Sequence, residues 1–89
     1  MFKNRRAKFL SLDSIRQKIA TFLMNNYKMQ NSTYVEIKMS RKSMAELMGI
    51  QRPSLSRELI NMKNEGIVDF DKDMFKIIDL DKLEDCLLK

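Results

Sequence analysis

Two arginines in the stretch RPSLSREL, Arg52 and Arg57, are the side chains of this sequence best suited to specific polar recognition. A guanidinium holds its N–H donors in one plane, so it can bind a carboxylate, a phosphate or the O6 and N7 edge of guanine in bidentate fashion. A second basic group, Ser40, Arg41 and Lys42, lies shortly before them. A hydroxyl and two cations at the start of a helix suit a phosphate, because unpaired backbone N–H groups there also attract anions.

The segment that carries Arg57 predicts a helix over about residues 53–65. Pro53 supplies a φ angle that suits the first helical turn and restricts the preceding residue to extended conformations. We therefore expect the helix to begin at Pro53, with Arg52 just outside it. Gly66 ends the pattern. The apolar residues share the spacing of one helical face: Leu55, Leu59 and Met62.

The opposite face of this helix is polar. At about 100° per residue, Arg57 points away from the apolar face together with Pro53 and Asn61. This stripe is the candidate recognition surface. The alternative for Arg57 is a surface residue that pairs with Glu58 or Glu65.

A shorter helix is predicted over about residues 41–48. Ser40 is a suitable N-cap, and Gly49 is well placed to close the helix in the left-handed conformation. Only GIQ separates this helix from the next one. Two helices joined by a tight glycine-containing turn form a helix-turn-helix. The apolar stripe of the shorter helix is Met44, Leu47 and Met48.

The other segments complete an α+β, mainly α fold, a winged helix-turn-helix with a small antiparallel sheet. A first helix is predicted over about residues 13–27, and a last one near the C-terminus. YVEIKM (34–39) alternates like a half-buried strand. IVDF and MFKII, separated by DKD, predict a hairpin that the first strand joins. The candidate caps are Ser11, Asp13 or Ser14 for the first helix and Asp79 or Asp81 for the last.

Composition favours one compact domain. The 89 residues are 44% hydrophobic and 33% charged, with two glycines and one proline, which is typical of a chain that folds. The chain has no histidine and one cysteine, Cys86, so the usual zinc sites, histidine-dependent triads and an internal disulfide are excluded. No apolar stretch approaches ~20 residues and the start lacks the apolar region of a signal peptide, so we expect a cytoplasmic location and no membrane contact.

The charge is unevenly distributed along the chain. The net charge is +5, but residues 1–66 carry thirteen Lys/Arg and five Asp/Glu, whereas residues 67–89 carry four and seven. The basic part attracts polyanions such as nucleic acid through Coulomb attraction and counterion release.

The stretch MSRKSMAELMGIQRPSLSRELINMKNEGIV resembles the helix-turn-helix of the Crp/Fnr family of bacterial transcription regulators. The family pattern has a Thr/Ser-Arg opening, a glycine turn, Arg-x-x-x-Ser-Arg and a Gly-hydrophobic exit. SLDSIRQKIATFL upstream and IIDLDKLE downstream extend the similarity over nearly the whole chain. The resemblance implies a winged helix that binds duplex DNA.

The same resemblance implies roles for individual residues. Ser40 and Arg41 match phosphate contacts of the family, and Gln51 matches a position near the DNA backbone. Arg52 and Arg57 match contacts to base edges, and Ser56 matches a family serine at the base-reading surface. No metal ligands are expected. The full expected site is Arg52, Arg57, Ser56 and Ser54 for bases, and Ser40, Arg41, Lys42 and Gln51 for phosphates.

Two features depart from the family pattern. Many members carry, at the place of Pro53, a glutamate that can accept a hydrogen bond from cytosine N4. Proline cannot make that contact, so one base position should be read differently or hardly at all. The predicted wing, DFDKD, has three aspartates and one lysine. We therefore expect it to contribute less than a basic wing, with Lys72 or Lys76 as its contacts.

The resemblance also implies parts that the chain does not contain. Family members place a cyclic-nucleotide-binding-like sensor and a long dimerisation helix before this domain. Residues 1–10 are then expected to be the end of the dimerisation helix or a hinge, and residues 11–89 the DNA-binding domain. The chain is expected to be an excised DNA-binding half, or else a natural truncation, of a homodimeric regulator of a palindromic site. No cofactor is expected in this chain, while the missing sensor would bind a cyclic nucleotide or another effector, and RNA polymerase is a candidate partner.

These features favour sequence-specific binding of double-stranded DNA for transcription regulation, with the helix over about 53–65 in the major groove. The alternative is a winged helix that docks on another protein through the same exposed stripe, which the acidic wing and the proline favour slightly. An enzyme is not expected, because no reaction class can be named without histidine, a glycine-rich phosphate loop or carboxylates paired in a pocket.

Overall fold

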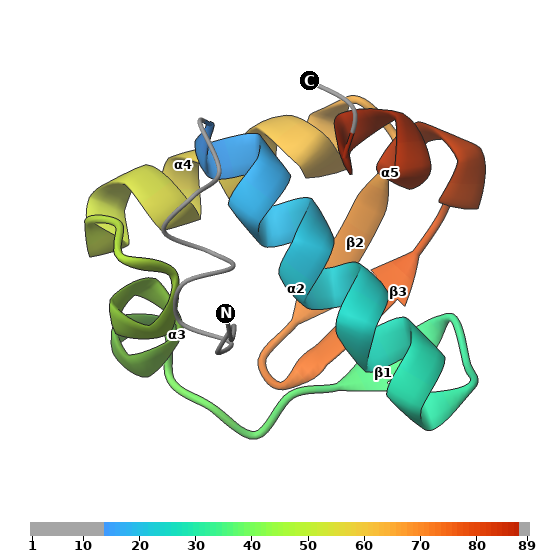
Figure 1. The fold of residues 1–89 in the computed structure, drawn as a ribbon, viewed down its shortest axis with the longest axis horizontal. Helices are drawn as coiled ribbons and strands as arrows, with labels where there is room; N and C mark the ends of the chain where they lie inside the picture. The colour runs from blue at the N-terminus through green and yellow to red at the C-terminus, as the bar shows by residue number, and fades with distance from the viewer. Residues whose placement is uncertain (1–13, 88–89) are drawn as a thin grey trace, which may run out of the picture.

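The structure is a computed structural model that describes residues 14–87. Within this range the chain forms the predicted winged helix-turn-helix, with four helices and a small sheet (Figure 1). The candidate caps Ser11 and Asp13 and the expected dimerisation segment 1–10 lie outside the described residues. The elements are α2 (Ile15–Gln30), β1 (Tyr34–Glu36), α3 (Arg41–Met48), α4 (Arg52–Asn64), β2 (Val68–Asp71), β3 (Met74–Ile77) and α5 (Leu80–Leu87).

The three strands form one antiparallel sheet in the order β1-β3-β2. In this sheet Phe75 of the central strand lies opposite Val35 of β1 and Phe70 of β2. The first strand joins the hairpin as predicted, but β1 ends at Glu36 instead of about residue 38. The next N–H, that of Ile37, still donates in register to the carbonyl of Asp73 at 2.8 Å. Asp73 belongs to the hairpin turn, where the partner chain reverses, so the ladder ends there.

Both ends of α2 are capped by side chain or backbone. The N–H of Gln17 donates to the hydroxyl of Ser14 at 3.0 Å, and the side chain of Gln17 accepts from the N–H of Ser14 at 3.2 Å, which forms a capping box. At the other end, Asn31 adopts the left-handed conformation, and its N–H donates to the carbonyl of Tyr27 at 2.7 Å. The helix therefore reaches Gln30, three residues beyond the predicted end at about Tyr27, because the left-handed Asn31 ends it rather than the start of the polar segment.

The turn between α3 and α4 follows the predicted glycine chemistry. Gly49 has a φ of 70°, and its N–H bonds back to carbonyls in the last turn of α3. The prediction that the next helix begins at Pro53 is wrong by one residue, because α4 begins at Arg52. N–H groups of a first turn have no helical acceptor, so a proline there removes no bond, and the helix can include the residue before it. Gln51 stands at the N-cap without a side-chain capping bond.

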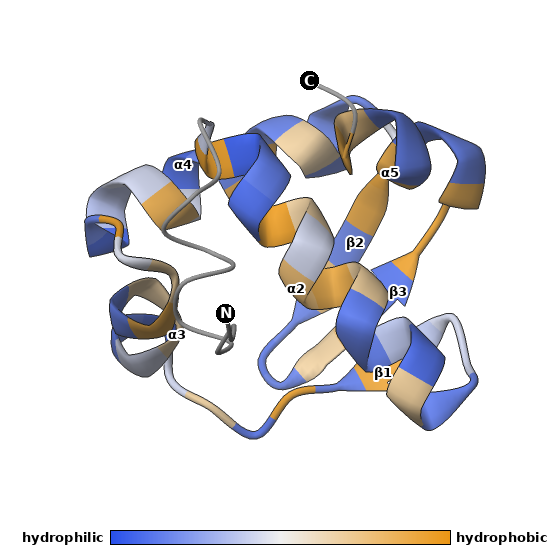
Figure 2. Cartoon of the chain, viewed as in Figure 1, coloured by the Kyte–Doolittle hydropathy of each residue, from blue (hydrophilic) through white to orange (hydrophobic). Residues whose placement is uncertain are grey.

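The core lies between the helices and one face of the sheet. Apolar and polar positions alternate along α2 and the strands (Figure 2), and α2 packs on α5, on α4 and on β1. The predicted apolar stripe of α4 is buried, as are Met44 and Met48 of α3, while Leu47 packs at the edge of the core. These contacts fix which face of α4 remains outside: the one opposite Leu55, Leu59 and Met62.

Neighbouring residues of α4 should differ sharply in their contribution to stability. Leu59 is 1% exposed and Ile60 is 52% exposed. Replacing Leu59 with alanine leaves a cavity and should lower the free energy of unfolding by about 2–5 kcal/mol, whereas Ile60→Ala should change it by less than about 0.5 kcal/mol. Urea unfolding followed by circular dichroism measures both. Equal losses in the two variants would contradict the orientation of α4.

Candidate nucleic-acid interface

The outward face of α4 presents the predicted readers to solvent. Arg52 and Arg57 are both exposed, and so are Pro53 and Asn61. Within residues 14–87, neither Arg52 nor Arg57 has a hydrogen bond or ion pair with another side chain. As far as the described residues go, both guanidiniums are thus available to an outside acceptor. Helical periodicity places this stripe correctly, since the apolar stripe of the same helix is buried.

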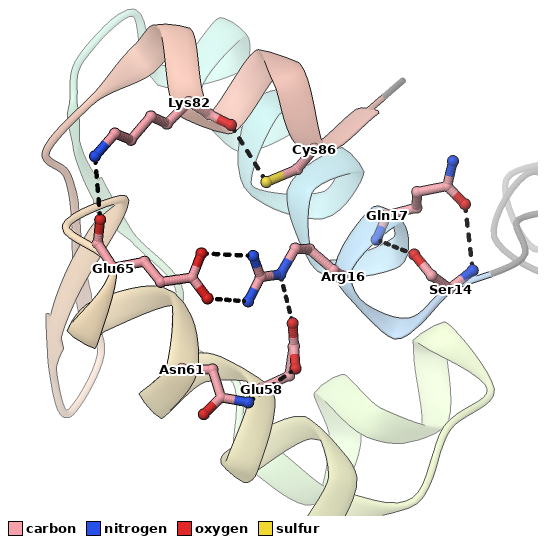
Figure 3. Close-up of polar contacts among 8 residues, drawn as sticks. All are labelled: Ser14, Arg16, Gln17, Glu58, Asn61, Glu65, Lys82 and Cys86. Atoms are coloured by element: carbon pink, nitrogen blue, oxygen red, sulfur yellow. Dashed lines mark hydrogen bonds and ion pairs between the residues drawn. The ribbon is translucent and has the colours of Figure 1, made fainter. Parts of the chain in front are cut away.

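The alternative in which Arg57 pairs with a nearby glutamate is wrong. Glu58 and Glu65 instead bind Arg16 of α2 (Figure 3). The Arg16 guanidinium donates from its two terminal nitrogens to the two carboxylate oxygens of Glu65, both at 2.8 Å, and its Nε donates to Glu58. We call this three-residue group the Arg16 bridge.

The Arg16 bridge is partly shielded from water, because the Arg16 side chain is 28% exposed. Its hydrogen bonds to Glu65, and then those to Glu58, raise the pKa of Arg16 despite the opposing effect of burial. The same hydrogen bond lowers the pKa of Glu65 below its usual range. Further bonds extend the group. Asn61 donates to Glu58 at 3.2 Å, and Lys82 of α5 donates to the carbonyl of Glu65 at 3.3 Å.

The bridge has an electrostatic consequence for α4. The acidic residue within this helix is Glu58 and the one at its C-cap is Glu65, and both are turned towards α2 and neutralised there. Among residues 14–87, the charges of Arg57 on the outward face and of Arg52 at the start of the helix stay unpaired. No signal in the sequence indicated this pairing, because Arg16 lies more than forty positions from Glu58 and comes to face the glutamates only through the tertiary packing.

At the start of α3, Ser40 acts as the predicted N-cap. Its hydroxyl accepts a hydrogen bond from the backbone N–H of Ser43 at 3.0 Å. It also donates to the side-chain hydroxyl of Ser43 at 3.1 Å. Lys42 is exposed. Lys42, Gln51 and Arg52 line one open surface hollow at the α3–α4 turn. The structure therefore brings two of the predicted phosphate contacts beside one predicted base reader.

Arg41 has a structural role that the sequence analysis missed. Its guanidinium lies over the ring of Phe75, 4.8 Å from the centroid, and 5.7 Å from that of Phe70. One terminal nitrogen donates to the carbonyl of Lys72 in the hairpin turn at 3.2 Å. Burial lowers the pKa of Arg41, while the charge of Asp73 opposes that effect. Arg41 thus joins the start of α3 to the wing, and the cation–π contacts of an arginine with the facing aromatics stabilise that junction.

The wing is a hairpin with a two-residue turn, Lys72 and Asp73. Lys72 has a φ of 55° and is exposed. Lys76 lies further from the turn, where its ammonium is 5.1 Å from the ring centroid of Tyr34. Of the two lysines expected at the wing, only Lys72 therefore stands at the tip.

The two predicted serines lie on opposite flanks of the outward face. Both Ser54 and Ser56 are half-buried. At about 100° per residue they fall on either side of Arg57. They therefore stand on different sides of this arginine around the helix.

Residues 14–87 hold no group of three His, Cys, Asp or Glu side chains suited to a metal ion. None of their helices combines the length and the apolar character that crossing a bilayer requires.

The Arg16 bridge predicts a change in acid sensitivity. Because the pKa of Glu65 is lower in the folded state, its contribution to stability is present above the unfolded pKa and is lost as the pH falls through the folded pKa. Arg16→Gln removes that difference. The stability of this variant, measured by urea unfolding, should therefore fall less than that of the wild type between about pH 7 and about pH 3.

Two features of the chain serve as references for this measurement. Lys28→Gln, which removes an exposed cation elsewhere on α2, should behave like the wild type. Asp69, whose pKa is lowered mainly by the N–H of Phe70, keeps its share of the acid sensitivity in every variant. An Arg16→Gln variant that loses as much stability on acidification as the wild type would refute the assigned role of the bridge.

The sequence matches the model of the Crp-like helix-turn-helix domain over residues 17–86. No curated protein matches the sequence. The fold is similar to that of a CRP-family transcriptional regulator from Thermus thermophilus, with a TM-score of 0.80 and 22% identity over 96% of this chain and 46% of that chain.

Two further solved structures share this fold. FixK2 from Bradyrhizobium japonicum has a TM-score of 0.79 and 19% identity over 91% of this chain and 42% of that chain. A regulator of the crp/fnr family from Eubacterium rectale has a TM-score of 0.77 and 21% identity over 94% of this chain and 38% of that chain. This chain spans less than half the length of each of the three. The match over residues 17–86 includes both helices of the helix-turn-helix and the wing, and the chain therefore belongs to the Crp-like helix-turn-helix domain family of DNA-binding transcription regulators.

Proposed function

We propose that this domain binds double-stranded DNA in a sequence-specific manner, with α4 in the major groove. One observation carries the proposal: Arg57 is exposed and unpaired among the described residues, while the glutamates within its helix and at its C-cap are held by Arg16. A free guanidinium on the outward face of a recognition helix suits bidentate binding to guanine O6 and N7. Arg52, at the start of the same helix, is the second base reader.

Phosphate contacts are assigned to the start of α3 and the turn that follows it. Lys42 and Gln51 are exposed beside Arg52. The N–H groups and the dipole of the first turn of α3 add attraction for an anion. Ser40 and Arg41 belong to the same region. Since the Arg41 guanidinium also lies against Phe75, its contribution combines charge with support of the wing.

The full regulator is proposed to bind as a dimer. Because the solved relatives are more than twice as long as this chain, a preceding segment would carry a sensor for a cyclic nucleotide or another effector and the helix that pairs two copies. Two copies would place α4 in successive major grooves of a palindromic site in the cytoplasm. RNA polymerase is the proposed further partner at such a site.

Arg57→Ala should lose discrimination between DNA sequences. Selection of bound duplexes from a random pool first gives the preferred site, and fluorescence anisotropy then compares it with a scrambled duplex. Losing the bidentate contact should reduce the discrimination by about 1–3 kcal/mol. Arg57→Lys is the matched control, since it keeps the charge but not the planar fork, and it should lose most of the discrimination while keeping non-specific affinity. Unchanged discrimination in both variants would refute the base-reading role of Arg57.

Lys42→Ala should weaken binding to all duplexes alike. A lost phosphate contact lowers the slope of log Kd against log salt concentration by about 1 and leaves the sequence preference as it was. Lys28→Ala is the matched control, because Lys28 is exposed beside α5, away from the α3–α4 turn. A salt slope that is equal in Lys42→Ala and the wild type would show that this lysine does not contact phosphate.

A further inference from the structure

Ile60 is an apolar side chain on the outward face of the recognition helix. It is 52% exposed, and of the large hydrophobic residues that are exposed in the described part of the chain, it alone lies on α4. It packs neither in the core nor at its edge. A single exposed isoleucine is ordinary on a protein surface, so its meaning depends on what lies around it.

The position of Ile60 relative to Arg57 places both on one ridge. Pro53, Ser56, Arg57 and Ile60 follow the spacing i, i+3, i+4 and i+7, which aligns side chains along one side of a helix. Homeodomain recognition helices read bases with residues at this same spacing. The third turn of α4 therefore continues the surface on which Arg57 stands.

The chemistry of the major groove provides one apolar target for such a residue. Thymine presents its C5 methyl group there, and apolar side chains recognise it by contact. The rise from Arg57 to Ile60 is about 4.5 Å along the helix axis, close to the ~3.4 Å that separates successive base pairs. A helix that sets Arg57 against a guanine thus carries Ile60 within one or two base pairs of it.

The surrounding charge favours DNA over a protein as the partner of Ile60. Arg57, without a partner among residues 14–87, shares its face, and Arg52, also without one, is exposed at the start of the same helix. Glu58 and Glu65 are drawn away by Arg16. A lone isoleucine among free cations does not form the contiguous apolar patch that protein interfaces use. It does match a groove whose walls are anionic and whose floor carries methyl groups.

We propose that Ile60 is a specificity-determining residue that contacts a thymine methyl group next to the guanine bound by Arg57. This inference rests on the proposed function. It also gives this domain a source of base preference apart from the position at which Pro53 cannot accept a hydrogen bond from cytosine.

Replacing thymine with uracil tests the contact, because uracil lacks only the C5 methyl group. Each thymine of the selected duplex is replaced in turn, and binding to the full chain is measured by fluorescence anisotropy at low salt. For the wild type, one replacement near the Arg57 guanine should weaken binding about fourfold, the value expected for losing one buried methyl group. For Ile60→Ala the same replacement should have no effect.

Ile78→Ala is the matched control. Ile78 is 49% exposed and follows β3 at the end away from the wing turn, so this variant should keep the uracil sensitivity of the wild type. Unfolding curves confirm that both variants fold. A selected duplex that binds the wild type equally well with uracil at every position, or an Ile60→Ala variant as sensitive as the wild type, would overturn the role of Ile60 alone. A pool from which no sequence is enriched would overturn the proposed function and this inference together.

Discussion

The Arg16 bridge is the interaction on which the recognition surface depends most directly. Apolar contacts of Leu55, Leu59 and Met62 fix which side of α4 is buried, but they tolerate small rotations because they are not directional. The forked hydrogen bonds from Arg16 to Glu58 and Glu65 restrict that rotation. The same bonds hold the carboxylates of Glu58 and Glu65 towards α2, away from the outward face of α4.

A second polar junction relates the wing to the helix-turn-helix. Arg41 lies at the first residue of α3, over the ring of Phe75, and bonds to the carbonyl of Lys72. The acidic wing is therefore fixed in position by an arginine of α3.

The sequence predicted the fold well because the local signals agreed with one another. Ser40 and Gly49 predicted the two ends of α3, and the structure confirms both. The apolar stripe of α4 predicted which face of that helix is buried, and this face is buried. The boundary errors arose where one signal dominated the interpretation. Pro53 suggested that α4 begins at residue 53, whereas the helix already includes Arg52. The polar segment after Tyr27 suggested that the first helix ends there, whereas α2 continues for three more residues.

The candidate site was predictable only in part, for a physical reason. Helical periodicity placed Arg57 and Asn61 outside, because that property depends on a single element. The partners of Glu58, Glu65 and Arg41 come from other elements and follow from the tertiary packing, which a single sequence does not display.

The methionines of the core give this domain an uneven susceptibility to oxidation. Met44, Met48 and Met62 beneath the helix-turn-helix are at most 1% exposed, whereas Met29 is 81% exposed. An oxidant reaches the surface thioether while the domain is folded, but it reaches the core ones only when the domain opens. A sulfoxide formed there is polar and would prevent the core from closing again. Oxidised core methionines would thus be found only in molecules that have unfolded before and can no longer refold.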